Sequence, residues 1–85
     1  MNLKILEDAK NLLTSILEIL GLAWWVEIVT DKPSCIYYFG PFLSKQEAKL
    51  HCPGYIEDLE QEDAVIVSWN IKQYQPKQLT IYQED

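Results

Sequence analysis

Three side chains have the chemistry for nucleophilic catalysis or metal binding: Cys35, His51 and Cys52. A thiol nucleophile needs a base and a third group that orients the base, and the sequence supplies no such group beside these residues. A metal site needs several ligands at a workable spacing, and the chain has no CxxC, HExxH or EF-hand pattern. The sequence therefore predicts no catalytic residue, no metal site and no cofactor, and Cys35 is interpreted as a small apolar strand residue.

A second group of chemical interest is a run of carboxylates in the third quarter of the chain: Glu57, Asp58, Glu60, Glu62 and Asp63. Asp58 and Glu62 are four residues apart, and like charges at that spacing cost a helix a few tenths of a kcal/mol. The later members also fall where the helix dipole disfavours anions. Two interpretations stay open: a solvated helix face, or an electrostatic docking patch for a basic partner.

The overall charge excludes some partners. Seven Lys, no Arg and thirteen acidic residues give a net charge of -6, which repels nucleic acid phosphates.

The longest apolar run, residues 19–26, is far shorter than the roughly 18 to 20 residues of a spanning helix, so no membrane span is predicted. Glu7 and Asp8 interrupt any secretory signal, and two cysteines are too few for a disulfide framework. We therefore expect a cytoplasmic protein.

Eighty-five residues predict one domain, residues 1–85, because so short a chain cannot fill two cores. Its first part, residues 1–21, is predicted to be an amphipathic helix ended by Gly21. The apolar residues of this helix occupy one arc about 160° wide; they are Ile5, Leu6, Ala9, Leu12, Leu13, Ile16, Leu17, Ile19 and Leu20. Such an arc requires a cover, which is either the sheet of the same chain or another chain.

Two strands are predicted to follow. Residues 24–30 and 35–40 are rich in aromatic and β-branched residues, and the turn residues between them predict an antiparallel hairpin. Gly40-Pro41 then turns the chain away from the sheet. Ser44, followed three residues later by Glu47, predicts a capping box in which each side chain bonds a free backbone N–H at the start of a second helix.

The rest of the chain is predicted to alternate between helix and strand. Pro53-Gly54 divides the second helix into two segments, the later one at 54–62. The next strand is predicted to place Val65, Val67, Trp69 and Ile71 on one face, and a short fourth strand follows at 79–82. The predicted fold class is α+β: a small single-layer antiparallel sheet of three to four strands packed with helices, in the order αββααββ.

The aromatic residues of the hairpin suggest a sheet with two apolar faces. If Val26 and Ile28 face the core, Trp25 points the opposite way, and Tyr38 on the next strand is a candidate for the same second face. One interpretation is that a second layer buries Trp25 and Tyr38. The other is that they form an exposed patch, in which case they would anchor a protein interface.

Four stretches resemble a known family: "WWVEIVT", "CIYYFGPFLSKQEA", "PGYIEDLEQE" and "QPKQLTIY". Together they are similar to the small cyanobacterial family called domain of unknown function 1816, over about residues 24–82. The resemblance implies an α+β core over these residues in a cyanobacterial, cytoplasmic setting. It implies no activity, cofactor or catalytic residue, and it leaves the N-terminal helix outside its strongest part.

The function most consistent with the sequence is a non-enzymatic interaction module: a small acidic adaptor or regulator of a larger cyanobacterial protein, photosynthetic or metabolic. The partner is an unidentified protein, and the candidate interface residues are Trp25, Tyr38 and the five carboxylates between Glu57 and Asp63. One alternative is a ligand-binding or enzymatic domain with a pocket between sheet and helices. Another is a structural homo-oligomer, with a homodimer formed through the N-terminal helix.

Overall fold

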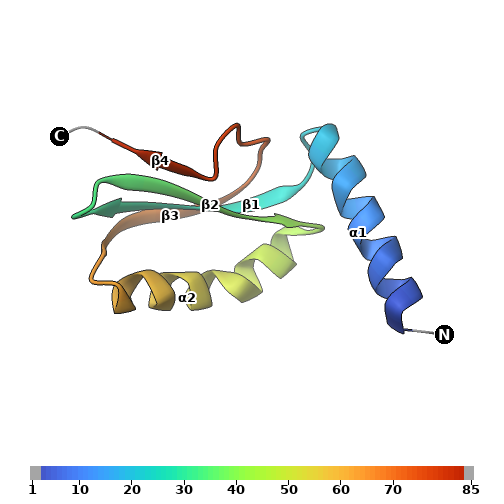
Figure 1. Cartoon of the computed structure of the whole chain (residues 1–85), viewed down its shortest axis with the longest axis horizontal. Coiled ribbons are helices and arrows are strands. Elements are labelled where there is room, and N and C mark those ends of the chain that lie inside the picture. The colour runs from blue at the N-terminus through green and yellow to red at the C-terminus, as the bar shows by residue number, and fades with distance from the viewer. Residues whose placement is uncertain (1–2, 84–85) are drawn as a thin grey trace.

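The computed structural model describes residues 3–83 and consists of two helices and a four-stranded antiparallel sheet (Figure 1). This confirms the predicted α+β class. The elements follow one another as α1 (Leu3–Ile19), β1 (Trp24–Asp31), β2 (Cys35–Phe42), α2 (Lys45–Gln61), β3 (Val65–Gln73) and β4 (Thr80–Tyr82). No helix within residues 3–83 is long and apolar enough to span a membrane.

Helix α2 is continuous, so the two segments predicted on either side of Pro53-Gly54 form one helix. A proline inside a helix removes one backbone hydrogen bond and tends to kink or break it. Here the buried side chains Ala48 and Cys52 precede Pro53 on α2, and Leu59 follows it. Because both halves pack on the same sheet, their burial outweighs the lost hydrogen bond.

The strands lie in the order β3-β1-β2-β4, and α2 covers one face of the sheet (Figure 1). The predicted hairpin of β1 and β2 is confirmed, with Glu27 opposite Tyr38 and Ile28 opposite Tyr37. The core between α2 and the sheet contains Val26 and Ile28, both fully buried.

A bulge in β3 changes its predicted faces. Val29 pairs with Ser68, but the next residue, Thr30, pairs with Ile66, so Val67 is an extra residue in the strand. Such a bulge reverses the alternation of side chains on its far side. Ile66 therefore packs against the core in place of Val65, and Val65 and Val67 stay more than half exposed.

Helix α1 stands apart from the rest of the molecule (Figure 1). The Cα radius of gyration is 14.3 Å, whereas a compact chain of this length has about 12 Å. As predicted, Gly21 ends the helix: it has φ 71°, and the N–H of Leu22 donates to the carbonyl of Leu17 at 2.7 Å. Residues 23–83, which we call the body, include the whole sheet and α2.

Ser44 begins α2, as predicted, because its hydroxyl accepts a hydrogen bond from the N–H of Glu47 at 3.1 Å. This is one half of the predicted capping box. The Glu47 carboxylate, predicted to bond back to the cap, instead accepts a hydrogen bond from Lys10 on α1.

Replacing Ser44 with Ala is expected to lower the free energy of unfolding by about 1 kcal/mol, because a helix donor loses its partner. Urea denaturation followed by circular dichroism measures this change. Ser68→Ala, at an exposed position of β3, is the matched control and should change the free energy by less than about 0.5 kcal/mol. Equal effects of the two substitutions would contradict the role of Ser44 as a cap.

Candidate protein-interaction surface

The outer side of α1 carries a continuous apolar surface. Seven large aliphatic side chains of the predicted arc are each between 47% and 74% exposed. We call this surface the α1 apolar face; it consists of Ile5, Leu6, Leu12, Leu13, Ile16, Ile19 and Leu20. Soluble monomers rarely leave so many aliphatic residues exposed side by side, and such patches mark sites of interaction.

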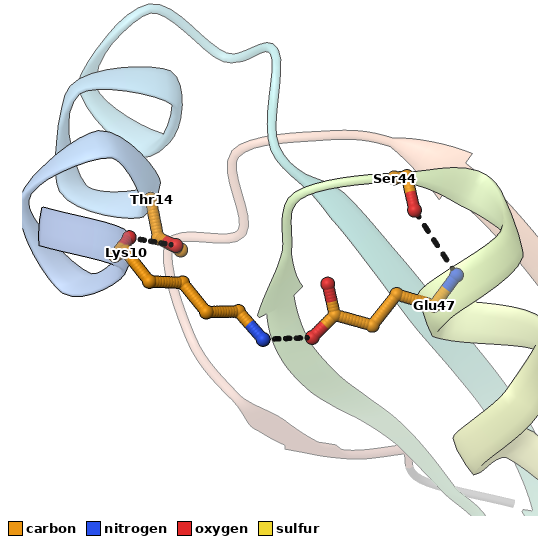
Figure 2. A network of polar contacts seen from close by, with 4 residues as sticks. All are labelled: Lys10, Thr14, Ser44 and Glu47. Carbon is orange, nitrogen blue, oxygen red and sulfur yellow. Dashed lines mark hydrogen bonds and ion pairs between the residues drawn. The ribbon is translucent and has the colours of Figure 1, made fainter. Parts of the chain in front are cut away.

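The polar side of α1 faces the body. A polar cleft of about 540 Å³ separates the helix from the start of α2 and the end of β2. Its α1 wall is made of Glu7, Lys10, Asn11, Thr14, Ser15 and Glu18, and its body wall of Pro41, Phe42 and Glu47. Figure 2 shows the ion pair that crosses this cleft, with Lys10 Nζ 2.9 Å from Glu47 Oε1. Within α1, the Thr14 hydroxyl donates to the carbonyl of Lys10.

This orientation is the reverse of the usual one. An amphipathic surface helix normally turns its apolar stripe to the core and its polar side to water. In α1 the polar side lies against the body, and the apolar side points away. The sequence predicted that the apolar arc is covered either by the sheet of the same chain or by another chain. The sheet of the same chain does not cover it.

The second face of the sheet is covered by a polar and aromatic cluster instead of α1. Glu27 Oε2 lies 2.8 Å from Lys72 Nζ and accepts a hydrogen bond of 2.8 Å from the Tyr38 hydroxyl. Lys72 Nζ also lies 4.4 Å from the centre of the Tyr74 ring, which packs on the Tyr38 ring. We call these four residues, Glu27, Tyr38, Lys72 and Tyr74, the Glu27 cluster.

The cluster shifts the acidities of its members. Burial raises the pKa of Glu27, but the hydrogen bonds from Lys72 and Tyr38, with the charge of Lys72, lower it more, so the net pKa lies below its usual value. Burial and the bond to the Glu27 carboxylate raise the pKa of Tyr38. Glu27 is therefore held in its ionised form.

Trp25 and Tyr38, two of the predicted interface residues, are not at the surface. Their exposed fractions are 2% and 8%. Trp25 lies opposite Lys72 in the sheet, and Tyr38 is held by the Glu27 cluster. The hypothesis that they form an exposed patch is wrong, because both side chains are buried. The predicted second layer is not what buries them: Lys72 lies opposite Trp25, and Tyr74 packs on Tyr38.

The five predicted carboxylates are all exposed at the C-terminal end of α2: Glu57, Asp58, Glu60, Glu62 and Asp63. Glu62 is the C-cap of the helix, and Asp63 follows it with φ 66°. This acidic end lies at the opposite end of α2 from α1 (Figure 1). The α1 apolar face and the acidic end are therefore two separate surfaces.

A third feature is an apolar groove of about 350 Å³ between α2 and β3. The sequence offered a pocket between sheet and helices as one alternative, but it did not indicate which residues would line it. Its walls are Lys49, Cys52, Pro53 and Ile56 on α2, and Trp69 and Ile71 on β3. Burial raises the pKa of the Cys52 thiol, which favours its unreactive form. The lining of this groove could not be predicted from the sequence, because it depends on the register of β3 and on the continuity of α2, which are both long-range properties.

The remaining candidates for chemistry stay apart. Cys35 is fully buried in β2, whereas His51 lies on an exposed part of α2, where its ring stacks on Phe42 at 5.3 Å. Over residues 3–83, the His, Cys, Asp and Glu side chains form no group of three that could hold a metal ion.

Fold and surfaces together define a small α+β domain with one exposed amphipathic helix. The chain belongs to the family described as "Domain of unknown function (DUF1816)", whose model matches residues 17–81. The match includes the whole sheet and α2 but only the end of α1. No curated protein and no solved structure matches the chain.

Proposed function

We propose that this protein is a non-enzymatic protein–protein interaction module, which binds another protein through the α1 apolar face. The observation that supports this proposal is the orientation of α1. An ion pair between Lys10 and Glu47 bridges its polar side and the body, and seven aliphatic side chains face solvent. Burying these side chains would stabilise a complex by removing apolar surface from water.

The chemistry of α1 favours a protein over a lipid or nucleic acid partner. Helices that lie on membrane surfaces carry many Lys and Arg residues on their polar side. The polar side of α1 instead carries Glu7, Asp8 and Glu18 beside Lys4 and Lys10, in a chain of net charge -6. Phosphate-rich surfaces would repel such a chain.

The acidic end of α2 is the second surface in this proposal. Its carboxylates would attract a basic region of a larger protein and accelerate association. The chain then acts as a small acidic adaptor or regulator. The resemblance of its motifs to a cyanobacterial family supports a setting in the cyanobacterial cytoplasm, with a photosynthetic or metabolic protein as the larger partner.

An affinity capture with matched variants tests the role of α1. The tagged chain, Leu13→Asp and Asn11→Asp are each incubated with cyanobacterial lysate, and bound proteins are quantified by mass spectrometry. Both variants add one negative charge to α1, Leu13 on its apolar face and Asn11 on the side that lines the polar cleft. We expect bound proteins to be lost only from Leu13→Asp. Equal recovery with all three baits would contradict the proposed function.

The groove between α2 and β3 supports a second candidate function, the binding of a small molecule. Its volume of about 350 Å³ falls at the lower end of ligand pockets. An apolar lining with Lys49 at its edge fits an aliphatic carboxylate. A rise in melting temperature with decanoate that disappears in Lys49→Ala would favour this function over the first.

A further inference from the structure

We infer that the partner of the α1 apolar face is a second copy of this chain, with the two α1 helices packed antiparallel. This inference rests on the proposed function, because it names the protein that covers the same face. It is supported by the spacing of the apolar residues, by the position of the body, and by the area and charge of the face.

The spacing is that of a helix-pairing seam. Apolar residues recur three and four residues apart along α1 and at its end, at Leu6, Ala9, Leu13, Ile16 and Leu20. This alternation keeps one stripe facing a partner helix. A second row of aliphatic residues, Ile5, Leu12 and Ile19, flanks the seam at seven-residue intervals. The face is therefore matched to another helix.

Antiparallel packing suits the one small residue of the seam. In an antiparallel pair, Ala9 lies opposite Leu13 of the second copy, so small and large side chains alternate and fill the space between the helices. In a parallel pair, Ala9 would lie opposite Ala9 and leave a void there. The opposed helix dipoles also favour the antiparallel arrangement.

The position of the body leaves room for the second copy. The body lies against the polar side of α1, where Glu47 pairs with Lys10. A second helix approaches from the opposite side, where the apolar residues are. In Figure 1 the acidic end of α2 is remote from α1, so most of the negative charge of each body stays away from the contact.

The exposed area is sufficient for a specific interface. The seven side chains of the α1 apolar face are each 47% to 74% exposed. Together they present an apolar surface on the order of the ~800 Å² that each partner contributes in a standard interface. The face contains no charged residue. Two copies would therefore bury it without leaving an unpaired charge in the contact.

Sedimentation velocity on the full chain tests the inference, from about 1 to 200 µM, a range that covers micromolar dissociation constants. We expect the wild type to reach twice the chain mass of 9.9 kDa. Leu13→Asp and Leu13→Gln should remain monomeric, and Asn11→Asp should dimerise like the wild type. Gln has a helix propensity close to that of Leu, so loss of the dimer in Leu13→Gln reports on the contact and not on helix unfolding.

Disulfide trapping tests the direction of the helices. Under mild oxidation, the double variant Leu6→Cys with Ile16→Cys, whose positions face each other in the same antiparallel register, should form dimers linked by a disulfide. Ala9→Cys alone should not. The native Cys35 and Cys52 are buried and should not compete. Efficient cross-linking of Ala9→Cys alone would overturn the antiparallel arrangement.

The outcomes separate this inference from the proposed function. A wild type that stays monomeric at 200 µM, or a dimer that persists in both Leu13 variants, overturns the inference. If the wild type is monomeric but Leu13→Asp still loses proteins in the capture experiment, the proposed function stands with a different partner. If Leu13→Asp changes neither measurement, both fail.

Discussion

Gly40→Ala is expected to lower the free energy of unfolding by about 3 kcal/mol. A Cβ atom at Gly40 would lie 2.8 Å from Cε3 of Trp25 and 3.0 Å from the carbonyl oxygen of Trp24. Neither neighbour yields easily, because the Trp25 side chain is buried and the Trp24 oxygen belongs to a paired strand. Overpacking of this kind costs about 1 to 3 kcal/mol in a packed core. Because one of the two close contacts is with a backbone oxygen, we expect the loss of stability in Gly40→Ala to lie at the upper end of that range.

Urea denaturation monitored by tryptophan fluorescence measures the effect of this substitution. Gly54→Ala is the matched control, because no atom lies within 4 Å of a Cβ at that position. Gly54 lies inside α2, where Ala is favoured over Gly by about 0.5 to 1 kcal/mol. The two substitutions should therefore change stability in opposite directions. A neutral Gly40→Ala would mean that β2 does not approach Trp25 this closely.

Glu27→Gln is expected to lower the free energy of unfolding by about 2 kcal/mol at pH 7, because the Glu27 cluster loses a charge-assisted hydrogen bond and leaves Lys72 without its carboxylate. The wild type should also lose stability in acid. The pKa of Glu27 is lower in the folded protein than its usual value of 4.5. Its stabilising contribution is therefore complete above that value and is lost as the pH falls through the folded pKa.

Unfolding free energies measured between pH 3 and pH 7 test this prediction. The difference between wild type and Glu27→Gln should be largest at neutral pH and shrink as the pH falls below about 4.5, the range of free glutamate. Glu60→Gln, which alters an exposed carboxylate of α2, is the control and should follow the wild-type profile. A constant difference between wild type and Glu27→Gln across the range would show that the ionised form of Glu27 does not stabilise the fold.

Local signals in the sequence predicted most of the elements. The apolar period of α1, the stop at Gly21 and the cap at Ser44 each depend on residues within a few positions of one another, and all three are present. The turn between β1 and β2 was predictable for the same reason. Such short-range preferences can be recognised in a single sequence.

The features that the sequence did not predict depend on contacts between residues far apart in the chain. Helix α2 continues through Pro53 because the sheet holds both of its halves, and the bulge at Val67 depends on pairing with β1. Trp25 and Tyr38 are buried because Lys72 and Tyr74, more than thirty residues away, reach the second face of the sheet. The exposure of the five carboxylates was predictable from their charge. The side of α1 that faces the body, where Lys10 pairs with Glu47, is a long-range property that the sequence does not reveal.

Because α1 stands apart from the body, the chain has two parts. The residues of the body determine the fold, whereas the exposed residues of α1 can be substituted without disrupting it. The side chains of the α1 apolar face are outside the core, so substitutions there should cost the sheet little stability. Under the proposed function, the same substitutions would alter what the protein binds. A few mutations in one helix would thus be enough to evolve a new assembly on an unchanged scaffold. The family model matches residues 17–81, which include the sheet and α2 but only the end of α1. Under the same proposal, quaternary structure would diverge through α1 while the tertiary fold is kept.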